Sequence, residues 1–383
     1  MIVDLEPDSV RRMTLTSAGG ALDALEAKNT RWPGGTLPPD VPYQYVEGEY
    51  MREDEYDLFL SDPTDFILRY QLPRMYGALA PLTKLPPLRN LGSLGFASFS
   101  RLFASPEFVR FAQALLAAGQ AQDKYHQVAG SFDDDMGQLG FPPAYHAGGG
   151  IGGAPFDAIS DFYRGMRGSM IDMHRHPDKL LAACEKVAEW RVAASLPSRP
   201  NGQKPAAANG QWAEVADVLD APVARSLPGG RKTQTRAFMP LHRGAEGFMS
   251  VQQFEKFYWP TLKKVILADV EIGCIPMPFW EGKCDSRLEY LLELPKGKVI
   301  CHFQDTDMFR AKEILGNHLC IMGNVPSSML QVGSPSEVEE YCAKLIKVCG
   351  KGGGFILTAG SAIDEANPAN VQAMIDSAKK YSP

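Results

Sequence analysis

CIPMPFWE at Cys274–Glu281 decides the fold, because an apolar run of strand length ends there in a charged residue. Three later stretches repeat this design: KVICH at Lys298–His302, LCIMGN at Leu319–Asn324 and FILTAGS at Phe355–Ser361. Helical stretches of similar length separate the four runs. This rhythm predicts parallel strands with crossover helices and with chemistry at the strand ends.

The polar strand ends are predicted to converge. In a (β/α)8 TIM barrel the residues just past each strand face one mouth, so Glu281, His302, Asn324 and Ser361 are expected to meet there. An open doubly wound sheet gives the same alternation and stays an alternative. A first strand is expected near Ala237–Leu241, and helices are expected from Val251 to about Val270 and at Arg287–Leu294, Met308–Leu315, Ser336–Val348 and Ala369–Lys379.

The N-terminal part is predicted to be a helical and irregular extension. Trp32–Tyr45 contains PGGTLPPD, which is expected to be an irregular arm. Arg52–Leu72 has apolar residues at helical spacing, and Pro81, Pro86 and Pro87 are expected to break this pattern into short helices. The prediction is therefore an α/β protein with an extension at residues 1–95 and a TIM barrel at residues 96–383.

Two further segments lie between the extension and the regular strands. FPPAYHAGGGIGG at Phe141–Gly153 predicts a loop near the barrel mouth, and no strand, turn and helix surround it as a dinucleotide site requires. Asp157–Met173 predicts an amphipathic helix. Its charged residues are expected to form a solvated face: Asp157, Asp161, Arg164, Arg167 and Asp172.

Composition excludes several classes of function. The 383 residues are 45% hydrophobic and 22% charged, as in a soluble globular protein, and the net charge of −6 disfavours nucleic-acid binding. No apolar run approaches the roughly 20 residues that span a bilayer, and the opening MIVDLEPDSVRRM is not a secretory signal. We therefore expect a cytoplasmic protein without membrane contact. The seven cysteines form no CxxC pair and are expected to be reduced, mostly buried side chains.

Three consecutive strands of the predicted sheet end in Glu or His. Glu281 follows the apolar CIPMPFW, where a carboxylate is costly unless it is paired or functional. His302 has the equivalent place one strand later, and His242 in PLHRG closes the strand before. A structural ion pair and a satisfied core histidine are the simpler interpretations. The functional one is a zinc site with an open position, or an acid/base pair.

Five motifs resemble those of the uroporphyrinogen decarboxylase superfamily, and specifically its methyltransferase branch. The resemblance covers residues 150–383 well and implies a β/α barrel. The motifs are PFDAISDFYRGMRGSMIDMHRHPDKL, GFMSVQQFEKFYWPTLKKVI, FWEG at Phe279–Gly282, GNVPSSML at Gly323–Leu330 and the closing GGFILTAGSAIDEANPANVQAM.

The resemblance also separates three activities. Decarboxylases of the superfamily carry an arginine-rich N-terminal motif that grips carboxylates, whereas Arg52, Arg69, Arg74 and Arg89 are spread out here. Members that methylate thiols hold zinc with a His-x-Cys pair and a later Cys. Those positions align with Phe279, Glu281 and Ser361, which puts the thiol-activating site in doubt.

The remaining likeness is to methyltransferases that start corrinoid-dependent demethylation. It implies that Glu281 and His302, with His242 as the least certain third ligand, hold zinc that stabilises the leaving oxygen of a methyl ether. A decarboxylase and a thiol:corrinoid methyltransferase stay as alternatives. A non-catalytic corrinoid-binding protein would not need Glu and His at neighbouring strand ends.

The corrinoid is expected on a partner protein. Asp172-Met173-His174 lacks the continuation that a cobalamin-binding segment needs. A small methyl donor is expected at the mouth: an aromatic methyl ether, a methylated amine, a methylthiol or a smaller alcohol. Homodimerisation follows from the resemblance only. The expected substrate-binding residues are Met277, Phe279, Trp280, Asn324 and Ser361, with Phe303 and the loop Tyr145–Ile151 as further candidates for an apolar pocket.

Overall fold

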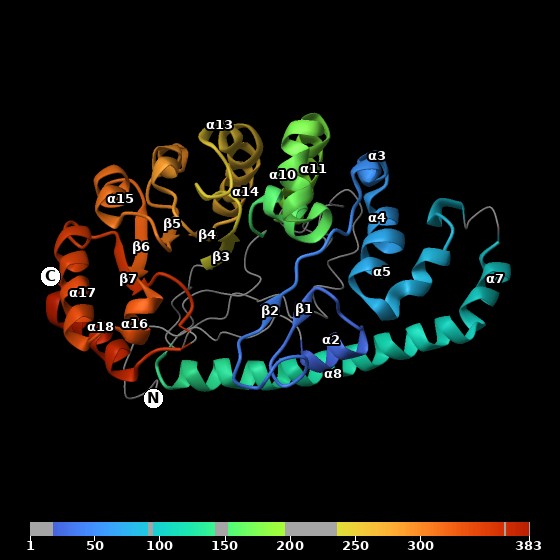
Figure 1. Cartoon of the computed structure of the whole chain (residues 1–383), viewed down its shortest axis with the longest axis horizontal. Coiled ribbons are helices and arrows are strands. Elements are labelled where there is room, and N and C mark those ends of the chain that lie inside the picture. The colour runs from blue at the N-terminus through green and yellow to red at the C-terminus, as the bar shows by residue number, and fades with distance from the viewer. Residues whose placement is uncertain (1–17, 91–94, 142–151, 196–235, 364, 383) are drawn as a thin grey trace. The chain divides into compact units, whose positions relative to one another are not determined.

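The computed structural model describes residues 18–90, 95–141, 152–195, 236–363 and 365–382 (Figure 1). The loop predicted at Tyr145–Ile151 and the first residues lie outside these ranges. By its contacts the chain divides into two compact units. The described part of one falls within residues 12–140 and 158–183, and that of the other within 141–157 and 184–383. The boundary placed at residue 95 stays a prediction.

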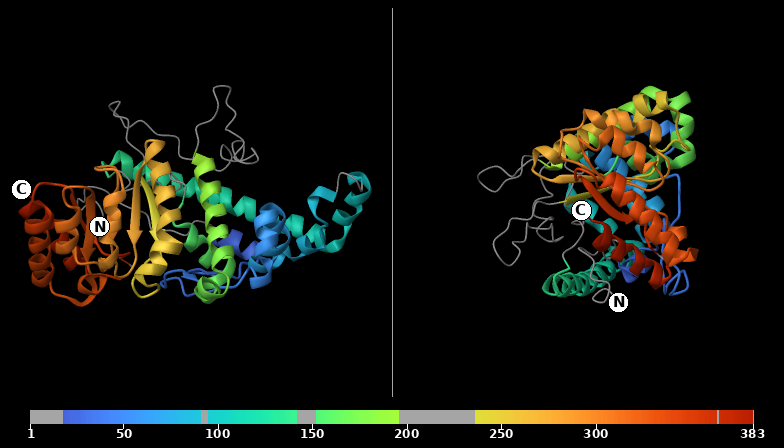
Figure 2. Two further views of the ribbon diagram at one scale, coloured as in Figure 1. Left: turned by 90° about the horizontal axis from the view of Figure 1, so that it is seen from above. Right: turned by 90° about the vertical axis from the view of Figure 1, so that its left-hand side faces the viewer.

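The second of these units contains a parallel sheet of five strands in chain order, β3-β4-β5-β6-β7 (Figure 2). The register pairs Leu241 with Trp280, Phe279 with His302, and Asn324 with Thr358. In the described residues this sheet is open, so the closed barrel is not seen there. The strands are β3 (Arg236–Leu241), β4 (Ile275–Trp280), β5 (Ile300–Phe303), β6 (Cys320–Val325) and β7 (Phe355–Ala359).

Helices cover one face of this sheet (Figure 1). The alternation along β3 shows why, because Ala237, Met239 and Leu241 are buried while the residues between them are half-buried. The helices α14, α15 and α17 pack on β4, β6 and β7. The segments are α13 (Val251–Gln253), η7 (Phe254–Tyr258), α14 (Trp259–Glu271), η8 (Asp285–Glu293), α15 (Met308–Leu315), α16 (Ser327–Val332), α17 (Pro335–Cys349) and α18 (Pro368–Tyr381).

Side-chain N-caps mark where two of these helices start, close to the starts predicted from the sequence. Asp307 accepts hydrogen bonds from the amides of Phe309 and Arg310 and so caps α15. Ser334 forms a capping box with Glu337 at the start of α17. The predicted strands and helices of this half are confirmed within about two residues, except that η8 is a 3₁₀ helix.

The other unit is mostly helical. Arg52–Leu72 and the residues after it form short helices, and Pro86 and Pro87 separate two of them as predicted. The break predicted at Pro81 is wrong, because Pro81 lies inside the 3₁₀ helix Gly77–Lys84. The proline-rich arm is bracketed by two-residue strands that pair with each other. The elements are α2 (Gly19–Ala24), β1 (Thr30–Arg31), β2 (Gln44–Tyr45), η1 (Glu53–Glu55), α3 (Tyr56–Ser61), α4 (Pro63–Phe66), η2 (Ile67–Gln71), α5 (Leu72–Met75), η3 (Gly77–Lys84), η4 (Leu88–Asn90), α7 (Phe96–Phe99), η5 (Ser100–Ala104), α8 (Pro106–Gln138), η6 (Ser160–Arg164) and α10 (Gly165–Arg175).

Two helices, α9 (Pro155–Ile159) and α11 (Pro177–Ser195), continue from one unit into the other. The solvated charged face predicted around α9, η6 and α10 is wrong. Arg164 is 4% exposed and Asp172 is 0% exposed, and only Arg167 of the five residues is exposed. Burial is tolerated because the Arg164 Nε donates to Asp172 Oδ2 at 2.6 Å, so that the two charges are paired.

The structure bears on two expectations drawn from composition, the state of the cysteines and the lack of a membrane span. All seven cysteines are free thiols, and five of them are buried. No helix in the described ranges combines the length and the apolar character needed to cross a membrane.

Candidate active site

A histidine and a glutamate meet at the ends of neighbouring strands. His242 follows β3 and Glu281 follows β4, and their positions are adjacent because Leu241 pairs with Trp280 in the sheet. The His242 Nε2 lies 3.6 Å from Glu281 Oε1. Their side chains are 35% and 39% exposed, so the pair is accessible from outside. The structure thus brings together two of the three side chains proposed as metal ligands.

The separation of this pair fits two ligands of one zinc ion. It is longer than an ordinary N–H···O hydrogen bond. Two ligand atoms on a tetrahedral zinc, each about 2.0–2.2 Å from the metal, are separated by roughly 3.4 Å. The donor types also suit zinc, which accepts imidazole nitrogen and carboxylate oxygen. Without metal, the same geometry is an ion pair when His242 is protonated.

His302 lies on the same side of the sheet as His242 and Glu281, but its contacts are with Phe279 and Ala359. Its ring lies 4.5 Å from the Phe279 ring, and its Nε2 lies 3.1 Å from the carbonyl oxygen of Ala359 at the end of β7. When Nε2 donates to that carbonyl, Nδ1 carries the lone pair and is the atom able to bind a metal or accept a proton. Ser361, two residues after Ala359, is half-buried close to this contact along the chain.

The three proposed ligands are not gathered at one point. Within the described residues, His302 does not join His242 and Glu281 in a group whose donor atoms all lie within 4.8 Å of one another. The group that does satisfy this criterion is Glu53, Asp172 and His176 in the helical unit. There Asp172 accepts hydrogen bonds from Arg164 and Tyr56, so its negative charge is already paired with the Arg164 guanidinium and is less suited to a metal ion.

An aromatic surface adjoins His302 on the face of the sheet away from the helices. Phe238 stacks on Phe279 with ring centroids 5.8 Å apart. Met277 lies on the same face, because it is two residues from Phe279 along the strand and pairs with Phe238. Trp280 points to the other face, where it is 1% exposed and its ring lies 6.3 Å from that of Phe254. Met277 and Phe279 therefore share the face of His302, whereas Trp280 does not. They are 3% and 9% exposed, so substrate contact by Met277 and Phe279 stays a prediction.

Asn324 is committed to the framework of the strand ends. It is 6% exposed, and its Nδ2 donates to the carbonyl of Thr306 at 2.9 Å. Its Oδ1 accepts from the Tyr341 hydroxyl at 3.0 Å. These bonds hold β6 against the loop after β5 and against α17. Substrate binding by Asn324 stays a prediction, because both ends of its side-chain amide are already hydrogen-bonded.

Asn324→Ala is therefore expected to lower the free energy of unfolding by about 2 kcal/mol, because Thr306 and Tyr341 lose a buried partner. Urea unfolding followed by circular dichroism measures this. A residue that served substrate binding alone would leave the midpoint unchanged and raise only the KM for the donor.

The cysteines do not provide a thiolate site in the described residues. Cys301 precedes His302 and points to the helix-covered face, where it is 0% exposed and burial raises the pKa of its thiol. Burial likewise raises the pKa of Cys284 to about 12. Thiolates at these positions are disfavoured, and the nitrogen and oxygen donors remain the stronger candidates.

The arginines of the N-terminal half are engaged with carboxylates of their own unit. Arg69 pairs with Asp65 at 2.5 Å, Arg74 with Glu55 at 2.6 Å, and Arg89 with Asp62 at 3.4 Å. Arg69 and Arg74 are also half-buried. This use differs from a cluster that grips the carboxylates of a tetrapyrrole.

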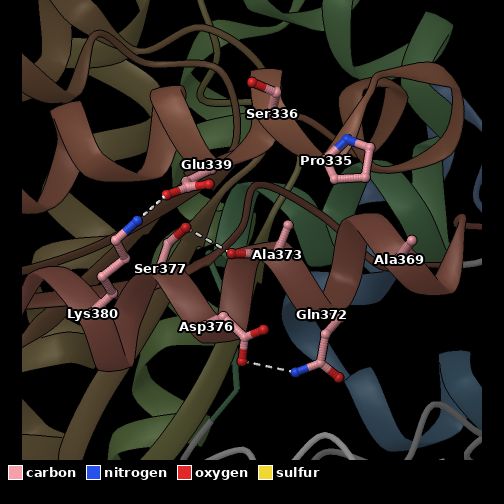
Figure 3. A pocket seen from close by; sticks show the side chains of 9 residues that line it. All are labelled: Pro335, Ser336, Glu339, Ala369, Gln372, Ala373, Asp376, Ser377 and Lys380. Atoms are coloured by element: carbon pink, nitrogen blue, oxygen red, sulfur yellow. Dashed lines mark hydrogen bonds and ion pairs between the residues drawn. The ribbon is translucent and has the colours of Figure 1, made fainter.

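A hollow between α17 and α18 contains none of the predicted site residues (Figure 3). Its polar side chains bind one another, since Lys380 Nζ donates to Glu339 at 2.7 Å and the Gln372 amide donates to Asp376 at 2.8 Å. We therefore place the candidate active site at the strand ends.

Comparison with known proteins finds a family likeness over the segment that contains most of the sheet. Residues 239–381 match the family model described as uroporphyrinogen decarboxylase (URO-D). Over these residues the chain is similar to the uroporphyrinogen decarboxylase family. The match contains all five strands except the first three residues of β3, so His242, Glu281 and His302 all lie in the uroporphyrinogen decarboxylase segment.

A solved structure shares the fold over nearly the whole chain. It is a methyltransferase from Methanosarcina mazei, 12% identical, with a TM-score of 0.51 over 99% of this chain and 82% of that chain. At this identity the likeness concerns the fold alone. No curated protein matches the sequence.

Asp157 is the functional candidate that the sequence analysis missed. Its carboxylate is 5% exposed and accepts a hydrogen bond from the backbone amide of His242. The signal was present in PFDAI, where a charged residue lies between apolar ones.

Proposed function

We propose that this chain is a methyltransferase that moves a methyl group from a methylated donor to the Co(I) corrinoid of a partner protein. The His242–Glu281 pair carries this proposal, since it offers a nitrogen and an oxygen donor 3.6 Å apart at accessible strand ends. The likeness of residues 239–381 to the family supports it, as does the fold shared with a methyltransferase.

The donor class is proposed from the aromatic surface beside the pair. Phe238 stacks on Phe279, and the Phe279 ring lies 4.5 Å from the ring of His302, so aromatic groups gather beside the pair and favour an aromatic donor. A methoxylated aromatic compound fits this surface better than a small alcohol. The neighbouring imidazole of His302, held through Ala359, is oriented to assist at a polar substituent of that ring.

The residues would divide the work of ether cleavage. The carbon–oxygen bond breaks with its electron pair on oxygen, while the methyl group passes to the corrinoid. Zinc, when bound by His242 and Glu281, would supply Lewis-acid stabilisation of the negative charge on that oxygen. Phe279 would hold the donor ring, and His302 would orient it by accepting a hydrogen bond at Nδ1, because its Nε2 faces the Ala359 carbonyl. Third-ligand status for His302 stays a prediction.

We further infer that the five strands are part of a (β/α)8 barrel, the architecture expected from the resemblance. The aromatic surface then faces the barrel interior. The alternatives have less support. Arg69 and Arg74, candidates for gripping carboxylates in a decarboxylase, are paired with Asp65 and Glu55. The positions of the thiol-activating ligands are occupied by Phe279, Glu281 and Ser361.

The test is metal content together with methyl transfer. Protein purified without chelator is expected to contain about one zinc per chain by mass spectrometry, and His242→Ala and Glu281→Ala are expected to lose it. Methoxylated aromatics incubated with a reduced corrinoid protein should shift its visible spectrum from Co(I) to methyl–cobalt. Metal-free, folded protein without such a shift would refute the proposal.

A further inference from the structure

The carboxylate of Asp157 lies beneath the end of β3 and binds the two residues that follow this strand. Its Oδ2 accepts from the His242 amide at 2.8 Å, and its Oδ1 accepts from the Arg243 amide at 3.0 Å. The Tyr258 hydroxyl, from η7, donates to Oδ2 at 2.8 Å. One buried carboxylate therefore orients the backbone that carries His242.

These bonds explain why a charge is tolerated there. A carboxylate removed from water is costly unless several donors satisfy it, and bonds to a charged acceptor are the stronger ones. Two consecutive amides bound by the two oxygens of one group fix the direction in which the His242 side chain leaves the backbone. That direction determines whether its Nε2 faces Glu281.

The segment that carries Asp157 is itself held against β3. Gly153 approaches the strand so closely that a Cβ there would lie 2.6 Å from the carbonyl oxygen of Pro240. The Arg191 guanidinium donates to the Gly153 carbonyl, and Phe156 packs on Tyr258 with ring centroids 5.9 Å apart. Asp157 is thus placed by a fixed segment.

We propose that Asp157 is a positioning residue for the metal site formed by His242 and Glu281. It holds the His242 backbone so that the imidazole and the carboxylate stay at the spacing of two ligands. The inference rests on the proposed function, because it takes zinc to be the ion that this pair binds. Asp157 itself contacts neither the metal nor the substrate.

The test is zinc affinity of the metal-free full-length protein, measured by competition with a chromophoric chelator. Asp157→Asn keeps the size of the side chain but cannot accept from both amides, and it is expected to weaken zinc binding about 10–100-fold. Tyr258→Phe removes one of the three bonds and leaves both amides bound, so its affinity should stay within about threefold of wild type.

Two further variants separate positioning from stability. Val338→Ala truncates a buried side chain in α17, a helix that supplies none of the three groups described above as donors to Asp157, and it should lower stability while leaving zinc affinity unchanged. Gly153→Ala displaces the segment without removing a charge, and it decides the question if Asp157→Asn does not fold. Cobalt(II) bound in place of zinc should show altered visible bands in Asp157→Asn, a change that lower stability alone would not produce.

The outcomes are distinguishable. Wild-type affinity in a folded Asp157→Asn would overturn the positioning role and leave the proposed function intact. Wild-type protein that binds no zinc would overturn the metal part of the proposed function and this inference with it. Weakened binding in Asp157→Asn, with Val338→Ala unchanged, supports the inference. Gly153→Ala takes the place of Asp157→Asn in both comparisons only if Asp157→Asn does not fold.

Discussion

Glu281→Gln is expected to reduce kcat/KM for methyl transfer at least about 1,000-fold, which corresponds to about 4 kcal/mol of transition-state stabilisation. The substitution keeps the shape of the side chain but removes the negative charge that lies 3.6 Å from His242. A neutral amide is a poor zinc ligand, so the Lewis acid and its effect on the leaving oxygen should be lost together. Stopped-flow spectroscopy of the corrinoid partner measures the rate, and mass spectrometry measures the zinc.

Glu289→Gln is the matched control. Glu289 is an exposed residue of η8, and the same chemical change there should leave both the rate and the metal content at wild-type values. Equal rates for Glu281→Gln and wild type would remove Glu281 from the mechanism. A slow variant that retains its zinc would instead assign Glu281 to proton transfer.

Asp172→Asn is expected to lower the free energy of unfolding by about 3–5 kcal/mol, because it leaves a buried guanidinium without its main counter-charge. Arg164 is 4% exposed and donates to Asp172 and to the carbonyl of Met51 at 2.6 Å. Asp172 also accepts from the Tyr56 hydroxyl at 2.7 Å. The remaining partner of Arg164, Glu49, is 55% exposed and compensates less well. Urea denaturation gives the free energy.

Arg167→Gln tests the neighbouring charge. Arg167 is exposed on the same helix, α10, and its loss should change stability by no more than about 0.5 kcal/mol. The double variant Arg164→Met/Asp172→Asn should lose less than the sum of its single variants, since the unpaired charge is then absent. An Asp172→Asn protein within about 1 kcal/mol of wild type would show that the pair is not coupled.

The regular half of the chain was predictable because its signals are local. The helix expected at Met308–Leu315 has those bounds in the structure, and the strands expected at Ala237–Leu241 and up to Asn324 appear within a residue of them. Apolar runs of strand length and helical periodicity depend only on neighbours in sequence. The short helices after Arg52 followed from proline for the same reason.

The site was predictable in outline only. Strand ends of a parallel sheet share one edge, so the meeting of His242 and Glu281 follows from position in the chain. The place of His302 does not, because its ring direction depends on the Ala359 carbonyl, which comes from a strand two places away in the sheet.

Residue order alone thus specifies the strands, the helices and the residues that end each strand, since these depend on local periodicity and on turn chemistry. Only the three-dimensional arrangement decides on which face of the sheet a side chain lies. It also decides which buried charges find hydrogen-bond donors or counter-charges. Trp280 lies on the helix-covered face of the sheet, where it is buried. The side chain of Asn324 is hydrogen-bonded to the carbonyl of Thr306. Asp157 was expected on a solvated face, but it is buried and binds the backbone of His242. The sequence did not indicate this, because its hydrogen-bond donors come from segments about 85 and 101 residues away in the chain.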